Sequence, residues 1–342
     1  MSYAFALAAA LLFAVSVPAG KLLLWYLKPF ELSSLCYLGS GVGLLAWHLF
    51  SGGGRAEASL ERRDLPYVWG FVLAGGVLAP LLLFTGLNLT SSSSVSILLN
   101  FELVFTSLIA VVIFREHGGV RFWAAAALIT AGACALSWEG GGVNFTPGAL
   151  LVLASSLFWA VDNNLTARVS IKNPVVLAAI KGLAGGAING GLAFYSYGTL
   201  PPLKFALAAL ALGLVSYGVS LVFFILAMRG LGASRAGAFF GAYPFIGAML
   251  SVIALGEPVT ARLLAGGGLM LAAFLALAFE RHGHAHRHDP LVHDHAHTHG
   301  DGHHGHKHEG AAAGQHAHPH SHGSVDHTHP HLPDAHHRHG HN

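Results

Sequence analysis

The stretch SSSSVSILLNFELVFTSLIAVVIFRE, residues 91–116, aligns without gaps with GASRAGAFFGAYPFIGAMLSVIALGE, residues 232–257. In this alignment Glu116 falls on Glu257, and each of them follows a long run of mostly apolar side chains. Any two runs of Ala and Leu align to some degree, but a shared acidic residue at the end makes chance the weaker explanation. The pair therefore indicates two copies of one structural unit within the chain.

A second pair of stretches supports the same repeat. LLFAVSVPAGK (11–21) lies over SLFWAVDNNLT (156–166), and Pro29 lies over Pro174. Of all residues in the chain, 54% are hydrophobic and 10% are charged, whereas a soluble domain carries about 25% charged residues. A soluble protein of this composition would expose too much apolar surface to stay dispersed, so we expect the repeats to lie in a lipid bilayer.

Ten apolar stretches are long enough to cross a bilayer as α-helices, which requires about 20 residues each. They are residues 3–25, 30–50, 66–88, 92–114, 119–138, 147–168, 174–196, 204–228, 233–255 and 259–280. The first stretch resembles a signal peptide. It lacks a charged region before its apolar run, however, and nine further runs follow, so we interpret it as a spanning helix.

Each copy of the repeat contains five of these stretches. Because five is odd, the second copy enters the membrane upside down relative to the first, an arrangement found in many secondary transporters. The sequence therefore predicts an all-α membrane protein of ten transmembrane helices in two inverted five-helix repeats. Repeat 1 occupies residues 1–140, repeat 2 occupies residues 146–281, and a disordered His-rich tail occupies residues 282–342.

Positive charges predict the orientation, because loops that face the cytoplasm are enriched in Lys and Arg. If the N-terminus is cytoplasmic, the inner loops carry Arg55, Arg62, Arg63, Arg115, Arg121, Arg168, Lys172, Arg229 and Arg235. The outer loops then carry only Lys28, Lys204 and Arg262. We therefore expect the N-terminus, the C-terminus and the whole tail on the cytoplasmic side.

The membrane part resembles the EamA family of the drug/metabolite transporter superfamily. The resemblance rests on the two five-span units and on the helix ends FRE (114–116) and LGE (255–257). It also rests on AYPF (242–245), which matches the Pro-containing fourth helix of the family. The family-motif residues carried over to this chain are Glu116, Pro244 and Glu257.

The first copy departs from the family pattern, because Leu103 in FELVF (101–105) stands where Pro is usual. This departure leaves open whether that helix is kinked. The stretch WAVDNNLT (159–166) and the tail resemble a bacterial subgroup, which implies the inner (plasma) membrane. The resemblance implies transport of small metabolites, often outward, without an ATP-binding domain, and the chain contains no GxxxxGK[ST] motif.

Polar side chains within the apolar spans mark the expected functional site, because a charge inside the bilayer is costly unless it is paired or hydrated. We assign the substrate cavity to Asn100, Glu102, Trp159, Asp162, Asn163, Lys181 and Tyr243. Tyr243 is the repeat mate of Glu102. Trp159 lies in mid-span, whereas most membrane tryptophans lie at an interface, so it is either a cavity wall or a core residue.

Asp162 and Lys181 lie on consecutive spans, each nine to ten residues from the turn near residues 171 and 172. At about 1.5 Å per residue they reach the same depth, so antiparallel neighbours can join them in an ion pair. Such a pair is either a gate or proton-coupling element that lines the cavity, or a static link between two packed helices.

Glu102 lies near the centre of its span, where desolvation favours a neutral carboxyl group. It is therefore a candidate proton carrier during transport, and the alternative is a buried Glu without that role. Lys21 is expected to extend toward the lipid headgroups. Glu116 and Glu257 are expected to brace the start of the helix that follows each of them.

Three glycines, Gly182, Gly186 and Gly190, recur at every fourth position of one span. This spacing places them on one helix face and predicts a close backbone approach to a neighbouring helix.

The tail is dominated by histidine, as HDHAHTHGDGHHGHKH (293–308) illustrates, and it holds 23 of the 25 histidines of the chain. Histidines two residues apart face the same side of an extended chain, roughly 6.6 Å apart, so flexible side chains can converge on one ion. Imidazole suits Zn, Ni, Co and Cu. The candidate metal ligands are His284, His286, His288, His293, His295, His297, His299, His303, His304, His306, His308, His337, His339 and His341. Rich in Gly and Pro, the tail is expected to be disordered without metal.

These observations favour a secondary transporter that exports a small metabolite or an amino-acid-like solute by alternating access. The chain shows neither a Ser–His–Asp arrangement nor a basic block, so it indicates neither an enzyme nor a nucleic-acid-binding protein. We expect no required cofactor. The expected partners are the lipid bilayer, a small-molecule substrate and transition metal ions, and a homodimer is compatible with the sequence.

Two alternatives stay open. The chain could carry a transition metal (Ni, Co or Zn) or a metal chelate that the tail delivers, although its spans contain no His or Cys cluster. It could also be a membrane-anchored metal sensor or buffer that transports nothing.

Overall fold

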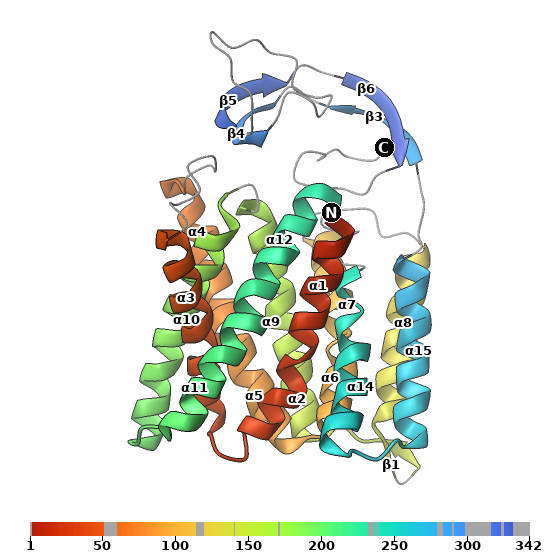
Figure 1. Cartoon of the computed structure of the whole chain (residues 1–342). Coiled ribbons are helices and arrows are strands. Elements are labelled where there is room, and N and C mark those ends of the chain that lie inside the picture. The colour runs from red at the N-terminus through yellow and green to blue at the C-terminus, as the bar shows by residue number, and fades with distance from the viewer. Residues whose placement is uncertain are drawn as a thin grey trace.

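The computed structural model describes residues 2–50, 60–113, 120–139, 141–169, 172–231, 236, 239–278, 283–288, 291–297, 316–322 and 325–330. Seven of the described helices are long and apolar enough to cross a membrane. Three shorter apolar helices, Trp123–Leu136, Tyr243–Leu255 and Ala261–Ala276, accompany them. Helices therefore occupy all ten predicted spans, and Figure 1 shows them standing side by side as one bundle.

The first copy begins with a span that a turn divides at Val15. Its elements are α1 (Ser2–Ala14), α2 (Ser16–Leu23), α3 (Pro29–Phe50), η1 (Arg62–Asp64), α4 (Leu65–Phe71), η2 (Val72–Leu78), α5 (Ala79–Leu89), α6 (Ser92–Leu98), α7 (Phe101–Val112) and α8 (Val120–Leu136). A short hairpin of β1 (Trp138–Glu139) and β2 (Gly142–Val143) then leads to the second copy. Gly141 in its turn has φ 86°, a left-handed conformation that favours glycine.

The second copy repeats the same order. Its described elements are α9 (Pro147–Val169), α10 (Pro174–Tyr197), α11 (Leu203–Leu212), η3 (Gly213–Val219), α12 (Ser220–Leu231), α14 (Tyr243–Leu255) and α15 (Ala261–Ala278). Pro29 and Pro174, which the repeat alignment pairs, begin α3 and α10. Pro suits the first position of a helix because its missing N–H would have no partner there.

Most close helix pairs join one copy to the other. Helices α3 and α10 pack together, as do α6 and α14, and α8 and α15. The first span of each copy packs against the third span of the other, through α1 with α12 and α9 with α5. This reciprocal pattern is what two copies related by an approximate two-fold axis produce, and it agrees with the inverted repeat.

Glycines allow α3 and α10 to approach closely. A methyl group added at Gly182 would overlap the backbone of Gly41, and one added at Gly186 would lie 2.6 Å from the backbone nitrogen of Leu38. One added at Gly190 would lie 2.8 Å from Ser34 Oγ. The packing predicted from the glycine spacing is confirmed.

The third span of each copy contains one π-helical segment, η2 and η3. The alignment that pairs Glu116 with Glu257 also pairs the first and last residues of η2 with those of η3. In η2 the carbonyl of Gly75 accepts a hydrogen bond from the Tyr37 hydroxyl, and the carbonyl of Gly76 accepts one from Asn189 Nδ2. Side chains therefore satisfy backbone groups that the wider turn leaves available.

The fourth span is interrupted in both copies. In the first copy a turn at Leu99–Asn100 separates α6 from α7, although Leu103 replaces the usual Pro. In the second copy a turn at Gly241–Ala242 precedes α14. The fourth span of the first copy is therefore interrupted at Leu99–Asn100 although it lacks the usual proline.

The structure describes four short strands in the tail, and the disorder expected there without metal stays a prediction. Strand β3 (Gly283–His288) pairs with β6 (Val325–Pro330), and β4 (Leu291–His297) pairs with β5 (His316–His322), both antiparallel. Alternation of His with other residues has the period of a strand. In Figure 1 the strands lie beyond the end of the bundle at which α1 begins, which we call the N-terminal face.

Candidate functional site

A cavity of about 60 Å³ lies between the two copies. Five of the predicted site residues line it together: Glu102, Trp159, Asp162, Asn163 and Lys181. The first copy contributes α1, α3 and α7, and the second copy contributes α9, α10, η3 and α12. Phe240 of the predicted span 233–255 also lines it, so side chains from seven different spans converge on one small space.

Asp162 and Lys181 form the ion pair that their equal depth predicts. Lys181 Nζ lies 2.6 Å from Asp162 Oδ2, and the two residues are only 7% and 3% exposed. Thr166 Oγ1 donates to the second carboxylate oxygen of Asp162 at 2.9 Å. A methyl group added at Gly75 would overlap the Asp162 carboxylate, so η2 packs directly against the pair.

Glu102 receives a hydrogen bond on each carboxyl oxygen. Asn163 Nδ2 donates to Oε1 at 2.7 Å, and the Tyr243 hydroxyl donates to Oε2 at 2.9 Å. The three residues belong to α7, α9 and α14, so the carboxyl group joins helices of both copies. Its repeat mate Tyr243 is thus its direct partner.

Two predicted residues do not line the cavity. Asn100 is buried, and its Nδ2 donates to the backbone carbonyl of Ile97 at 2.7 Å, where α6 ends. Tyr243 is also absent from the lining, but its hydroxyl group donates to Glu102, which belongs to the lining. An amide next to a helix break can satisfy the interrupted backbone instead of facing a solute, and the assignment of Asn100 to the solute site stays a prediction.

Aromatic residues that the sequence argument missed form much of the wall. The ring of Phe13 lies 5.8 Å from that of Trp159, 5.4 Å from that of Tyr217 and 4.8 Å from that of Tyr243. Tyr37 and Tyr217 also line the cavity. Both are mid-span tyrosines, whereas membrane tyrosines usually lie at an interface, so the criterion applied to Trp159 would have found them.

The hydroxyl groups of Tyr217 and Ser16 are buried and have no hydrogen-bond partner among the described residues. Tyr217 lies in η3, and Ser16 begins α2 directly after the turn in the first span. Tyr217 lines the cavity and Ser16 does not, so the cavity wall presents one such hydroxyl group, that of Tyr217.

Lys21 and Glu257 both bind backbone groups at helix ends. Lys21 Nζ donates to the backbone carbonyls of Leu87 at 2.6 Å and Thr90 at 2.8 Å, so it caps the end of α5. Glu257 accepts from the backbone amides of Ser92 at 2.7 Å and Ser93 at 2.8 Å. Glu257 therefore braces the start of a helix, as predicted. The helix is α6 of the first copy, whereas the prediction named the helix that follows Glu257 in the sequence.

An ion cluster joins the copies near the N-terminal face. Lys172 Nζ lies 3.0 Å from Glu61 Oε1 and 3.5 Å from Asp64 Oδ2. The hydrogen bond from Lys172 lowers the pKa of the exposed Glu61 carboxyl. The sequence argument used Lys172 only for orientation and did not detect this contact.

Some predicted residues lie outside the described residues. They are Glu116, His299, His303, His304, His306, His308, His337, His339 and His341. The remaining candidate metal ligands, His284, His286, His288, His293, His295 and His297, lie on β3 and β4. In the described part of the chain no group of three or more His, Cys, Asp or Glu residues is arranged to hold a metal ion.

Comparisons with known proteins identify the family. The EamA-like transporter family matches residues 1–138 and 146–279. A curated relative from Methanothermobacter thermautotrophicus, described as an uncharacterized transporter, is 29% identical over 286 residues, which are 79% of this chain and 83% of the relative. A crystal structure of a protein 20% identical to this chain superposes with a TM-score of 0.62, over 81% of this chain and 98% of that one, and shows the same fold. The chain belongs to the EamA-like transporter family and is a multi-pass membrane transporter.

Proposed function

We propose that the protein is a secondary transporter of the inner membrane that exports a small metabolite or amino-acid-like solute by alternating access. The cavity between the copies is the proposed solute site, and both termini face the cytoplasm. The observation that carries the proposal is the position of Glu102. Its carboxyl group lines the cavity and is held by Asn163 and by Tyr243, so its protonation state acts on helices of both copies.

The lining suits a small solute with polar and apolar parts. The Asp162–Lys181 pair and Glu102 supply charge, while Phe13 and Trp159 supply apolar surface. Protonation of Glu102 would remove the acceptor charge that attracts Asn163 and Tyr243 and would loosen the contact between the copies. This provides a physical link between proton movement and the change of access.

Replacement of Glu102 by Gln is expected to uncouple transport from the pH gradient. Gln keeps the size and polarity of the side chain but cannot exchange a proton. A metabolite profile of the medium around overexpressing cells identifies the solute, and proteoliposomes then measure its flux. We expect Glu102→Gln to reduce flux driven by a pH gradient to the level of empty vesicles, while solute exchange at equal pH keeps most of its rate.

Glu31→Gln is the matched control. Glu31 is a buried carboxyl at the start of α3 that accepts from the backbone amide of Lys28 at 2.8 Å and does not line the cavity. It should leave the pH dependence of flux unchanged. A Glu102→Gln protein with the wild-type pH profile would rule out the coupling role of this residue.

We further propose that the tail binds divalent transition metal. The register of the strands supports this idea: His284 lies opposite His329, His286 opposite His327, and His293 opposite His320. Cβ atoms of directly opposed residues are about 4.5–5.5 Å apart, so imidazoles from two strands can share one ion. Asp294 and Asp326 lie within the same strands and offer carboxylate oxygens.

Equilibrium dialysis against Zn²⁺ tests the tail. The full chain is expected to bind several ions at pH 7.5 and to release them as the pH falls through about 6.5, because a ligating imidazole must be neutral. A chain that ends at residue 281 should bind none, and equal binding by both chains would contradict the proposal. Solute flux is then measured for both chains with and without Zn²⁺. An effect of Zn²⁺ that requires the tail indicates a carrier that the tail supplies with metal or that metal gates. Flux that Zn²⁺ does not change indicates a tail that only buffers metal.

A further inference from the structure

Each copy turns between its first two spans, and each turn contacts the start of the third span of the other copy. At the N-terminal face, Lys172 between α9 and α10 contacts Glu61 and Asp64 at η1. At the opposite face, Tyr26 between α2 and α3 contacts Phe205 at the start of α11. We call the first the ionic contact and the second the aromatic contact. Figure 1 shows these elements at opposite ends of the bundle.

The two contacts occupy equivalent places in the inverted repeat. The alignment of the prolines that begin α3 and α10 places Leu27 over Lys172, and the alignment of η2 with η3 places Phe205 over Asp64. Charged side chains therefore stand at one face where apolar side chains stand at the other. The two faces thus hold the copies together through different physical forces.

The ionic contact depends on ionic strength. Lys172 and Asp64 are buried, whereas Glu61 is exposed and also pairs with Arg63, at 3.0 Å between Oε2 and Nε. Salt screens the attraction between charges that water reaches, so it weakens the bond from Lys172 to Glu61. Arg63 stays beside Glu61 when Lys172 withdraws, and this remaining counter-charge lowers the cost of opening the contact.

The aromatic contact does not depend on charge. The rings of Tyr26 and Phe205 are stacked, with centroids 3.9 Å apart and planes 8° from parallel. Lys204 Nζ lies 5.6 Å from the centre of the Phe205 ring, but both residues belong to α11, so this interaction does not join the copies. The stack of two neutral rings depends on buried apolar surface and ring geometry, which salt does not screen.

Each contact joins helices that wall the cavity between the copies, which we call the central cavity. Behind the aromatic contact, α3 carries Tyr37 and η3 carries Tyr217, and these rings lie 5.4 Å apart. Behind the ionic contact, α9 and α10 carry the Asp162–Lys181 pair, against which Gly75 of η2 packs. Opening of either contact therefore parts two walls of the central cavity at one face.

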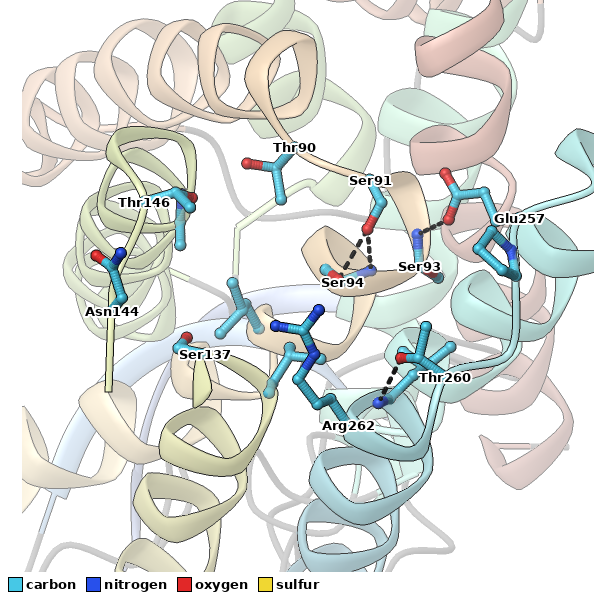
Figure 2. Close-up of a pocket in the computed structure, with 15 residues that line it drawn as sticks. Thr90, Ser91, Ser93, Ser94, Ser137, Asn144, Thr146, Glu257, Thr260 and Arg262 are labelled. Carbon is cyan, nitrogen blue, oxygen red and sulfur yellow. Dashed lines mark hydrogen bonds between the residues drawn. The ribbon is translucent and has the colours of Figure 1, made fainter. Parts of the chain in front are cut away.

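Both contacts are closed in this structure. A second cavity, of about 220 Å³, lies at the face opposite the N-terminal face, and Figure 2 shows its polar lining. Among the described residues, none that lines this cavity also lines the central cavity. The two spaces are therefore separate, and entry to the central cavity from this face requires a movement of the helices.

We propose that the two contacts are the gates of the solute site. The ionic contact closes the central cavity toward the N-terminal face, and the aromatic contact closes it toward the opposite face. One gate opens while the other stays closed, and ionic strength regulates access from the N-terminal face alone. This inference rests on the proposed function, because it assigns the two halves of an alternating-access cycle to named side chains.

Modification of a single cysteine in the central cavity tests the gates without a known solute. Ser220 lines the central cavity, and Ser220→Cys is introduced into a full chain in which Cys36 and Cys134 are replaced by Ala. A membrane-impermeant thiosulfonate is added to sealed vesicles of either orientation. Ser2→Cys, at the start of α1, reports in parallel which face each preparation presents.

Lys172→Gln should raise the rate of modification from the N-terminal face about tenfold, which corresponds to about 1.4 kcal/mol. It should not raise the rate from the opposite face. Arg62→Gln removes the same charge from an exposed position of η1 and is the matched control, with no expected effect. An equal rise from both faces would show general loosening of the bundle and would overturn the assignment.

Salt tests the ionic gate without any change to its residues. An increase of NaCl from 0.05 M to 0.5 M, about a threefold shorter screening length, should raise the rate from the N-terminal face at least threefold. The rate from the opposite face should stay unchanged, and so should both rates of the Lys172→Gln protein. A rate from the N-terminal face that does not respond to salt would refute the ionic gate.

Tyr26→Ala should raise the rate from the opposite face at least threefold, at low and at high salt. Trp25→Ala, which removes the exposed neighbouring ring, is its matched control and should have no effect. An unchanged rate in the Tyr26→Ala protein would refute the aromatic gate.

Solute flux in the same vesicles separates the gates from the proposed function. One-sided changes of modification in a protein without any flux would retain the gates and refute transport. Flux through a protein whose rates of modification are the same in all variants would retain transport and refute the gates.

Discussion

Asp162→Asn is expected to abolish transport and to destabilise the bundle by about 3–5 kcal/mol, because it leaves the buried Lys181 without its counter-ion. Lys181 Nζ otherwise lies 5.4 Å from the centre of the Phe71 ring, which cannot replace a carboxylate. Thr166 loses its charged acceptor at the same time. Thermal unfolding of the protein in detergent, together with solute flux in proteoliposomes, measures both effects.

The double variant Asp162→Asn/Lys181→Met distinguishes the two interpretations of the pair. Removal of both charges should restore most of the lost stability, because replacing both partners of a buried ion pair by neutral groups is often neutral or stabilising. If flux returns together with stability, the pair is a static link between α9 and α10. If stability returns without flux, the charges take part in the transport cycle. If the protein with Asp162→Asn alone were as stable as the wild type, the pair would not be buried in the membrane.

Gly182→Val is expected to prevent assembly of the bundle. A Cβ at this position would overlap the backbone of Gly41 on α3, and the carbonyl oxygen of Tyr37 would lie only 2.7 Å from it. Because the obstacle is backbone, no side-chain rotation relieves it. The cost should therefore exceed the about 1–3 kcal/mol that is typical of overpacking with side chains. Loss of the monodisperse peak in size-exclusion chromatography is the expected result.

Gly191→Val on the same helix is the matched control. No atom lies within 4 Å of a Cβ at Gly191, outside its own helix segment, so this change adds the same side chain to α10 without an obstacle. It also carries the same lower helix propensity of a β-branched residue. Equal loss of protein from both variants would point to helix propensity and not to the α3–α10 contact.

The spans and the repeat could be predicted from the sequence because both leave regular patterns. Apolar length determines where helices cross, and equal spacing from one turn was sufficient to pair Asp162 with Lys181. Repeat alignment also selected Tyr243, which proved to be the partner of Glu102. These features depend on the number of residues between two positions, which can be counted in the sequence.

Contacts across the copies could not be predicted in the same way. Glu257 braces a helix that starts 165 residues earlier in the chain, and Lys172 reaches Glu61 over 111 residues. Asn100 shows the converse problem, since a polar residue type does not reveal whether its side chain faces a cavity or an interrupted backbone. Such details depend on how helices rotate and pack, which residue spacing alone does not determine.

The widened turns η2 and η3 also bear on the history of the chain. They occupy aligned positions, yet their sequences VLAGGVL and GLVSYGV share few residues. A matching irregularity at the same point of both copies is what duplication of a single unit that already contained it would produce. In the present chain the two segments share backbone geometry but differ in side chains, so two similar backbones enclose a cavity whose two sides are chemically different.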